Sequence, residues 1–259
     1  MTHVSVRRDR GIAIVELASP ATGNALSAGM VSELRETIAT LPDLGARALV
    51  LVGSGRHFCT GAHLGEIERL AKASLADRLA DAERLAALYS TLLRCPLPTL
   101  AAVHGAAYGG GAGLAGACDF VLAEPGASFQ FSEVRLGFVP ALISVFLPRR
   151  LPVARLAQLF IAPAPLSAGE AQATGLVDEV VEEACAAAVT RATQMCRTAA
   201  PSAIAATKAL LLALTFPNLD ADLAHAARLN AEQRAHPECQ RGLAAYLNDR
   251  SFPDWTQGL

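Results

Sequence analysis

Three consecutive glycines, Gly109 to Gly111, lie between an apolar segment and a segment of small residues. The apolar segment, 99–103, is typical of a buried strand, and residues 112–117 favour a closely packed helix. Glycine is placed where the backbone takes unusual dihedral angles or where another group must approach it closely. The first N–H groups of a helix have no intrahelical partner, and the positive end of the helix dipole lies behind them. This arrangement is suited to binding an anionic oxygen.

The glycine triplet alone does not identify a ligand. It lacks the Lys-Ser/Thr pair of a phosphate-binding P-loop, and its spacing is not GxGxxG. The same glycines could instead serve only to bring a helix close to a sheet. Both interpretations stay open from this motif taken by itself.

A second glycine-rich turn occurs about fifty residues earlier, in LVLVGSGRHFCTGAHLGE (49–66). It has the same order of strand, glycines and helix start. Two such turns could each supply one backbone N–H to a common point. A pair of aligned donors is what a thioester carbonyl needs when it becomes an enolate oxyanion.

Together, five motifs resemble the crotonase (enoyl-CoA hydratase/isomerase) superfamily, and they stand in the family's order. They are Asn24-Ala25-Leu26, GSGRHFCTGAHL (53–64), VHGAAYGGGAGLAGACDF (103–120), FSEVRLGFVP (131–140) and LSAGEAQATGLVDEVV (166–181). The resemblance covers essentially the whole chain. It implies that the two N–H groups of the oxyanion hole belong to Ala62 and Gly110.

The resemblance also implies an α/β fold and an assembly. We expect a crotonase-like spiral of β-β-α units over 1–200 and a helical C-terminal trimerisation subdomain over 201–259. A homotrimer, or a homohexamer built as a dimer of trimers, is expected. The substrate would be an acyl-CoA thioester, with no further cofactor and no metal.

Two glutamates flank the substrate double bond in the hydratases that this chain resembles. The position of one is taken by Gly113, and Glu133 occupies the other. Apolar neighbours on both sides of Glu133 would desolvate its carboxyl and raise its pKa towards the range useful for proton transfer. The alternative is a surface ion pair between Glu133 and Arg135.

A single carboxylate is compatible with several reactions. We expect reversible syn hydration of a 2-enoyl-CoA, with Glu133 as acid and base, and residues 132–144 are similar to 3-methylglutaconyl-CoA hydratases. The alternatives are a Δ3,Δ2-enoyl-CoA isomerase, a decarboxylase or dehydratase acting on a branched acyl thioester, and a catalytically silent binding protein. The sequence does not determine the length or branching of the acyl chain.

Binding residues follow from the resemblance, position by position. Those expected to contact substrate or coenzyme A are Ala25, Leu26, Arg56, Thr60, Gly61, His63, Leu64, Gly109, Gly113 and Lys208. His63 replaces the usual aspartate, and we favour a structural hydrogen-bonding role for it. The loop 19–23 lacks the basic residues that often meet CoA phosphates, so a thioester on an acyl-carrier protein stays an alternative.

These motifs must be positioned by strands that alternate with helices over the first 180 residues, which indicates an α/β fold. The predicted strands are 4–8, 12–17, 48–52, 99–103, 119–123 and 176–181. The predicted helices are 27–40, 66–93 with a break near 73–74, 142–150, 153–161, 168–174, 183–198, 202–215, 219–235 and 238–247.

The composition excludes some classes of partner. The net charge is −2 over 259 residues, which argues against a binder of nucleic acid or of membrane surfaces. None of the six cysteines stands in a CxxC or metal-like spacing, and the N-terminus is polar. We therefore expect a cytoplasmic protein with free thiols. Cys59, within the first glycine turn, is expected to be a small packed residue, not a nucleophile.

Overall fold

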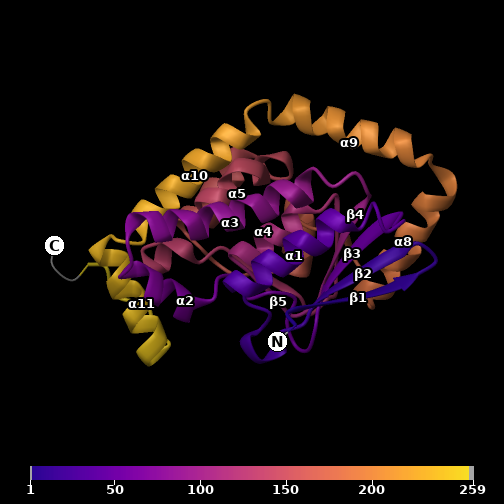
Figure 1. Cartoon of the computed structure of the whole chain (residues 1–259). Coiled ribbons are helices and arrows are strands. Elements are labelled where there is room, and N and C mark those ends of the chain that lie inside the picture. Colours follow the sequence, from indigo (N-terminus) through magenta and orange to yellow (C-terminus); the bar gives the residue numbers. More distant parts are fainter. Residues whose placement is uncertain (1, 257–259) are drawn as a thin grey trace.

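A computed structural model describes residues 2–256, and its main feature is a six-stranded sheet with helices on both faces (Figure 1). The strand order is β1-β2-β3-β4-β6-β9; β1 and β2 form an antiparallel hairpin, and every later pair is parallel. The strands are β1 (Val4–Asp9), β2 (Ile12–Leu17), β3 (Ala48–Gly53), β4 (Thr99–Val103), β6 (Phe120–Ala123) and β9 (Glu179–Val180). The α/β fold predicted from the sequence is therefore confirmed.

The helices follow the predicted segments closely. They are α1 (Ala28–Thr40), α2 (Leu64–Ala71), α3 (Leu75–Leu93), α4 (Gly110–Ala117), α5 (Ala141–Phe146), α6 (Val153–Ile161), α7 (Ala168–Thr174), α8 (Ala184–Thr198), α9 (Pro201–Thr215), α10 (Leu219–Gln233) and α11 (Pro237–Asp249). Three short 3₁₀ turns are η1 (Pro20–Thr22), η2 (Glu133–Leu136) and η3 (Leu147–Arg149). The predicted helix 142–150 is wrong in its second half, which is the η3 turn.

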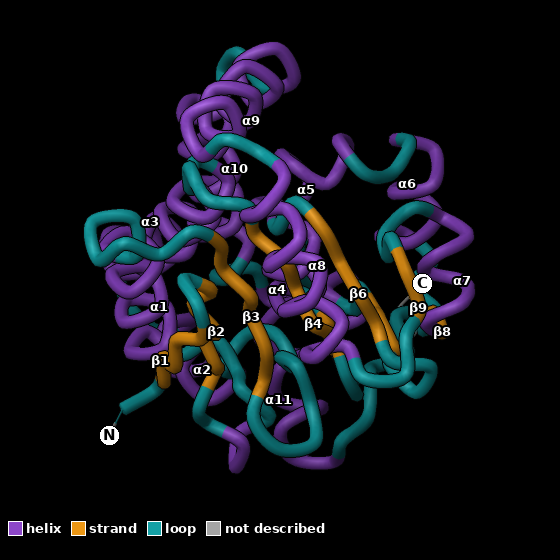
Figure 2. The backbone as a smooth tube through the Cα atoms, turned by 90° about the vertical axis from the view of Figure 1, so that its right-hand side faces the viewer, coloured by secondary structure: helices purple, strands orange, loops and turns teal. Residues whose placement is uncertain are grey.

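Alternate residues of the strands face two separate hydrophobic layers, because side chains of a strand point to opposite faces in turn. In β3, Leu49 and Leu51 join the large layer that contains α1, α3 and α4. Ala48 and Val50 join a smaller layer on the opposite face, where α8 contributes Ala184, Ala188 and Ala192. Figure 2 shows α8 in front of the sheet on this face.

A second sheet of three short strands was missed by the sequence analysis. It consists of β5 (Ala106–Tyr108), β7 (Ser128–Gln130) and β8 (Leu166–Ser167), in the order β5-β7-β8. Strands of two or three residues are too short to show a periodic pattern. The sheet matters for function because β5 leads directly into the glycine triplet and β7 leads towards η2.

The C-terminal helices pack against earlier parts of the chain. Helix α10 contacts α3 and α5, and α11 contacts α2 and η2. Helix α9 runs along the edge of the molecule between α8 and α10 (Figure 1), and none of its residues is buried. The division at residue 200 stays a prediction.

A membrane span was sought among the described helices. None of them alone combines the length and the apolar composition needed to cross a bilayer. The pair α8 and α9 reaches both limits together, but it is bent by 109°.

Candidate active site

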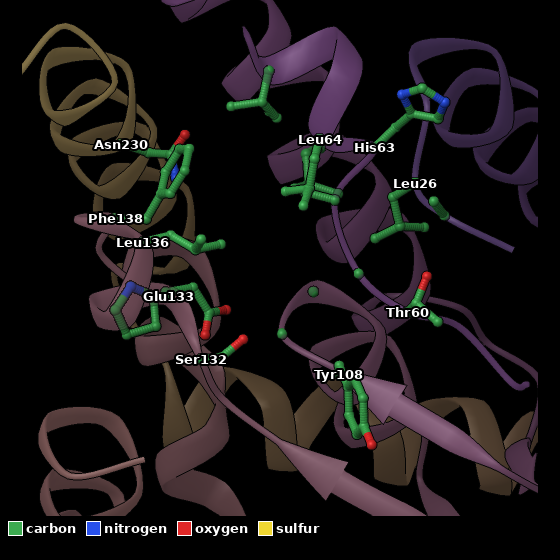
Figure 3. Close-up of a pocket in the computed structure, with 18 of the residues that line it drawn as sticks. Leu26, Thr60, His63, Leu64, Tyr108, Ser132, Glu133, Leu136, Phe138 and Asn230 are labelled. Carbon is green, nitrogen blue, oxygen red and sulfur yellow. The ribbon is translucent and has the colours of Figure 1, made fainter. Parts of the chain in front are cut away.

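The two glycine turns meet at a cavity of about 740 Å³. Figure 3 shows Leu26, Thr60 and His63 along one side of it and Glu133, Leu136 and Asn230 along the other. The predicted residues that line the cavity are Ala25, Leu26, Thr60, Gly61, Ala62, His63, Leu64, Gly109, Gly110 and Glu133. Segments far apart in the sequence therefore converge at one site.

Backbone contact between the two turns requires glycine at specific positions. Gly61 has φ +91°, and a Cβ there would lie 2.6 Å from the Tyr108 carbonyl oxygen and 3.5 Å from the Gly110 nitrogen. A Cβ on Gly111 would lie within bonding distance of the Cys59 carbonyl oxygen. The Tyr108 N–H also donates to that oxygen at 3.0 Å. The turns are thus held close together in the geometry that a pair of donors requires.

The N–H groups of Ala62 and Gly110 are available to a ligand. Among the hydrogen bonds of residues 2–256, neither group donates to a protein acceptor. Gly110 is the first residue of α4, so its N–H lies at the positive end of the helix. Both groups border the cavity, and together they can accept an oxyanion.

Asn24 ties the substrate-side loop to the first glycine turn. It is fully buried and takes a left-handed conformation with φ +56°. Its amide NH₂ donates to the carbonyls of Ser54 at 2.9 Å and His57 at 2.7 Å. The adjacent Leu26 N–H donates to the Gly61 carbonyl at 2.8 Å, so Ala25 and Leu26 form one wall beside Ala62.

Tyr89 supports the second turn from α3, and the sequence analysis missed it. Its buried hydroxyl donates to the Gly110 carbonyl at 2.9 Å. Burial raises the pKa of Tyr89 well above its ordinary value, so the phenol stays a neutral donor. Tyrosine in an apolar helical pattern is usually a core residue, and no local signal pointed to this contact.

Glu133 opens the 3₁₀ turn η2, and its carboxyl lies over the glycine triplet. A Cβ on Gly109 would be 3.1 Å from Glu133 Oε1, and Gly109 has φ +50°. Glu133 Oε2 is buried and finds no hydrogen-bond partner within the described chain. The expected alternative, an ion pair with Arg135, is wrong, because the Arg135 guanidinium lies 4.4 Å from the centre of the Phe252 ring.

Helix α11 and the end of α10 hold the η2 turn in place. A Cβ on Gly242 of α11 would lie 2.5 Å from the Leu136 carbonyl oxygen, so helix and turn are in backbone contact. The Gln233 amide donates to the Gly137 carbonyl at 3.0 Å. The C-terminal helices therefore position the acidic residue, which the sequence analysis did not anticipate.

Desolvation raises the pKa of Glu133 to about 7, from an ordinary value of 4.5. Between these values the folded protein binds a proton that the unfolded chain releases, so this group makes stability fall as pH rises from 4.5 through 7. Above pH 7 the full cost is about 3 kcal/mol. We expect Glu133→Gln to raise the free energy of unfolding at pH 8 by up to that amount, and to change it little near pH 4. Urea unfolding at both pH values tests this, and a difference independent of pH would contradict it.

The position expected for a second carboxylate is closed. A Cβ on Gly113 would lie within bonding distance of Ile143 Cγ2 and 3.2 Å from the Tyr89 hydroxyl. Gly113 is buried and does not line the cavity. The site therefore offers one carboxylate at the glycine turns, and the predicted contact of Gly113 with substrate receives no support from the geometry.

Two predicted CoA-binding cations also lie outside the cavity. Arg56 is exposed on the first turn, away from the cavity wall. Lys208, on α9, forms an ion pair with Asp119 and donates to the Leu97 carbonyl. The assignment of both to CoA phosphates thus receives no support from the chain as described.

His63 and Cys59 behave as expected of structural residues. His63 is the N-cap of α2, and its Nδ1 accepts the Glu66 N–H at 3.3 Å. Burial raises the pKa of the Cys59 thiol to about 12, so the thiolate nucleophile is not formed near neutral pH. All six cysteines are free.

The sequence profile of the enoyl-CoA hydratase/isomerase family matches residues 7–258. A Thermus thermophilus protein, named as an inferred enoyl-CoA hydratase, is 36% identical over 246 residues, covering 92% of this chain and 95% of that protein. Enoyl-CoA hydratase AKT6-1 of Alternaria alternata is 31% identical over 259 residues, covering 97% of this chain and 84% of its own length. The crystal structure of an enoyl-CoA hydratase from Mycobacterium avium is 30% identical, with a TM-score of 0.85, covering 99% of this chain and 100% of its own. The matched family spans both glycine turns and Glu133, and this chain belongs to the enoyl-CoA hydratase/isomerase family.

Proposed function

We propose that this protein catalyses the reversible syn hydration of a 2-enoyl-CoA thioester. The Glu133 carboxylate takes a proton from water, and the water oxygen bonds to the β-carbon. The π electrons of the double bond move through the α-carbon to the thioester carbonyl oxygen. The N–H groups of Ala62 and Gly110 hold the resulting enolate. Glu133 then returns the proton to the α-carbon on the same face.

The carboxyl of Glu133 is the observation that carries this proposal. It lies over Gly109, next to the free N–H of Gly110, and one of its oxygens has no protein partner. Its pKa of about 7 leaves substantial fractions of both protonation states at neutral pH. A carboxyl so placed can accept and return a proton beside a developing enolate.

The isomerase is the second candidate, because Ile143 and Tyr89 occupy the space beside Gly113. With one carboxylate, Glu133 could carry a proton between the α- and γ-carbons of an enoyl thioester without adding water. Decarboxylation, dehydration of a branched substrate and a silent binding role make no specific use of this feature.

The remaining assignments are proposals as well. A cytoplasmic location is supported by six free thiols, since a reducing compartment keeps cysteines unpaired. Assembly into a trimer or hexamer is supported by α9, which exposes Leu210, Leu211 and Leu214. Coenzyme A is proposed as part of the substrate, with an acyl-carrier protein as the alternative carrier.

Mass spectrometry after incubation in D₂O with a panel of CoA thioesters tests the function. The panel holds straight 2-enoyl, 3-enoyl, 3-methylglutaconyl and ethylmalonyl thioesters. Gain of one water with one deuterium at the α-carbon supports the hydratase. Deuterium uptake without water supports the isomerase, loss of CO₂ supports the decarboxylase, and no change in any substrate contradicts all three.

A further inference from the structure

A cluster of charged residues lines the cavity wall formed by α3 and α10. We call it the distal cluster, and it consists of Asp81, Arg84, Asn230 and Arg234. Asp81 bridges the two arginines: Oδ1 accepts from Arg84 Nη1 at 3.0 Å, and Oδ2 accepts from Arg234 Nη1 at 2.6 Å. None of these residues belongs to the oxyanion hole or to the acid/base group.

The distal cluster has more positive charge and more donors than its own contacts use. One carboxylate faces two guanidinium groups, which leaves a net charge of +1. The side chain of Arg234 is only 4% exposed, yet its Nε has no acceptor within the described residues. Asn230 Oδ1, one turn earlier on α10, is also buried without a partner. A buried donor without an acceptor is costly, so these groups point to a polar ligand.

A purely structural role does not account for the second arginine. Arg234 and Asp81 alone would link α10 to α3 as a neutral pair. Arg84 adds a charge to a cavity wall that otherwise continues through apolar side chains such as Leu85, Leu136 and Phe138. An arginine presents a planar fork of donors that matches a carboxylate.

The position of the distal cluster along α3 sets its distance from the oxyanion hole. Tyr89 of α3 contacts Gly110 at the hole, Leu85 lies one turn earlier, and Arg84 and Asp81 lie beyond it. At 1.5 Å per residue, Arg84 is about 7.5 Å from Tyr89 along the helix axis, and Asp81 about 12 Å. A thioester carbonyl bound at Gly110 would therefore have its acyl chain pass Leu85 before the charged groups.

We propose that the distal cluster binds a carboxylate at the far end of the acyl chain, so that the substrate is the monothioester of an unsaturated dicarboxylic acid. The arginines of α3 and α10 donate to that carboxylate, and the apolar wall between them and the hole accommodates the intervening carbons. This inference rests on the proposed function for the thioester end alone.

Binding of saturated thioesters, which have no double bond to hydrate, tests the proposal without turnover. Calorimetric titration compares glutaryl-CoA with pentanoyl-CoA, adipoyl-CoA with hexanoyl-CoA, and suberoyl-CoA with octanoyl-CoA. We expect the dicarboxylic member to bind about ten- to hundredfold more tightly for at least one chain length, as for hydrogen bonds to a charged group. In Arg84→Gln this ratio should fall to about two or less.

Two further variants show that the change is specific. Arg84→Lys retains the charge but not the fork, so an intermediate ratio is expected. Arg94→Gln is the matched control: Arg94 caps the same helix, pairs with Asp220 and lies outside the cavity wall, so the wild-type ratio should persist.

The outcomes separate this inference from the proposed function. Equal or weaker binding of the dicarboxylic member at every length overturns the distal cluster, whether or not the variants fold. An unchanged ratio in a folded Arg84→Gln overturns the role of Arg84. If neither member of any pair binds, thioester binding itself fails. If both bind equally and crotonyl-CoA is hydrated, only the distal carboxylate is wrong.

Discussion

Replacing Glu133 with Gln is expected to lower kcat for hydration by about 10²–10⁴-fold, the usual contribution of a positioned acid or base. The substitution retains size and removes only the ability to exchange a proton. Wild-type kcat/KM for hydration should rise as pH increases through about 7, because water attack requires the carboxylate form and the pKa of Glu133 is about 7. This inflection should be absent from any residual activity of the variant. Initial rates with the best thioester of the panel, measured from pH 5 to 9, provide the test.

The matched control is Glu182→Gln, an exposed glutamate between β9 and α8 that lies outside the cavity wall. Its rate and pH profile should equal those of the wild type. Full activity of Glu133→Gln, or an unchanged inflection near pH 7, would exclude Glu133 as the acid/base residue. Because burial disfavours the Glu133 carboxylate, Glu133→Gln is also expected to be at least as stable as wild type at pH 8, so loss of activity through unfolding is not expected.

The second large effect is expected from Gly110→Pro compared with Gly110→Ala. Proline removes the N–H proposed for the oxyanion hole, whereas alanine keeps it, and both introduce a Cβ 3.1 Å from Leu26 Cδ1 and from the Tyr89 hydroxyl. We expect kcat of the proline variant to be about 10²–10³-fold below that of the alanine variant, which corresponds to ~2.7–4 kcal/mol for one donor.

The backbone at this point can accept proline. Gly110 is the first residue of α4, where a missing N–H breaks no helical hydrogen bond. Gly109 has φ 50° and ψ −120°, the mirror image of the extended conformation that proline favours in the residue before it. Circular dichroism and the Tm of both variants verify folding. Equal kcat values for two folded variants would mean that the Gly110 N–H does not stabilise the transition state.

The closed position beside Gly113 has a consequence for how the reaction is divided among residues. With Ile143 and Tyr89 occupying that space, one carboxyl must both remove and return the proton. A pKa near neutrality suits this double role, because the group must change its protonation state twice in each turnover. The same requirement applies to hydration and to isomerisation, and water entry to the β-carbon distinguishes them.

The sequence by itself determined those features whose cause lies within a few residues. Ser27 and Ser74 are the N-caps of α1 and α3, and Gly175 ends α7 in a left-handed conformation. The break between α2 and α3 and the main parallel strands also followed from local patterns. Capping, periodicity and the dihedral freedom of glycine act over one or two turns of chain, so they can be read without knowledge of the fold. The two glycine turns and Glu133 belong to this class, because each was found by motif.

Only the tertiary structure decided which groups those motifs meet. The Tyr89 hydroxyl reaches Gly110 across 21 residues, Ile143 blocks the space beside Gly113, and Arg234 reaches Asp81 across 153 residues. The short second sheet and the support of Glu133 by α10 and α11 likewise depend on packing between distant segments. Lys208, expected near CoA from its motif, pairs with Asp119 instead. A local pattern specifies a residue's dihedral angles and burial, but its partner is chosen by the packing of the whole chain, and here that packing left one carboxylate at the oxyanion hole and a cluster of positive charge along the acyl cavity.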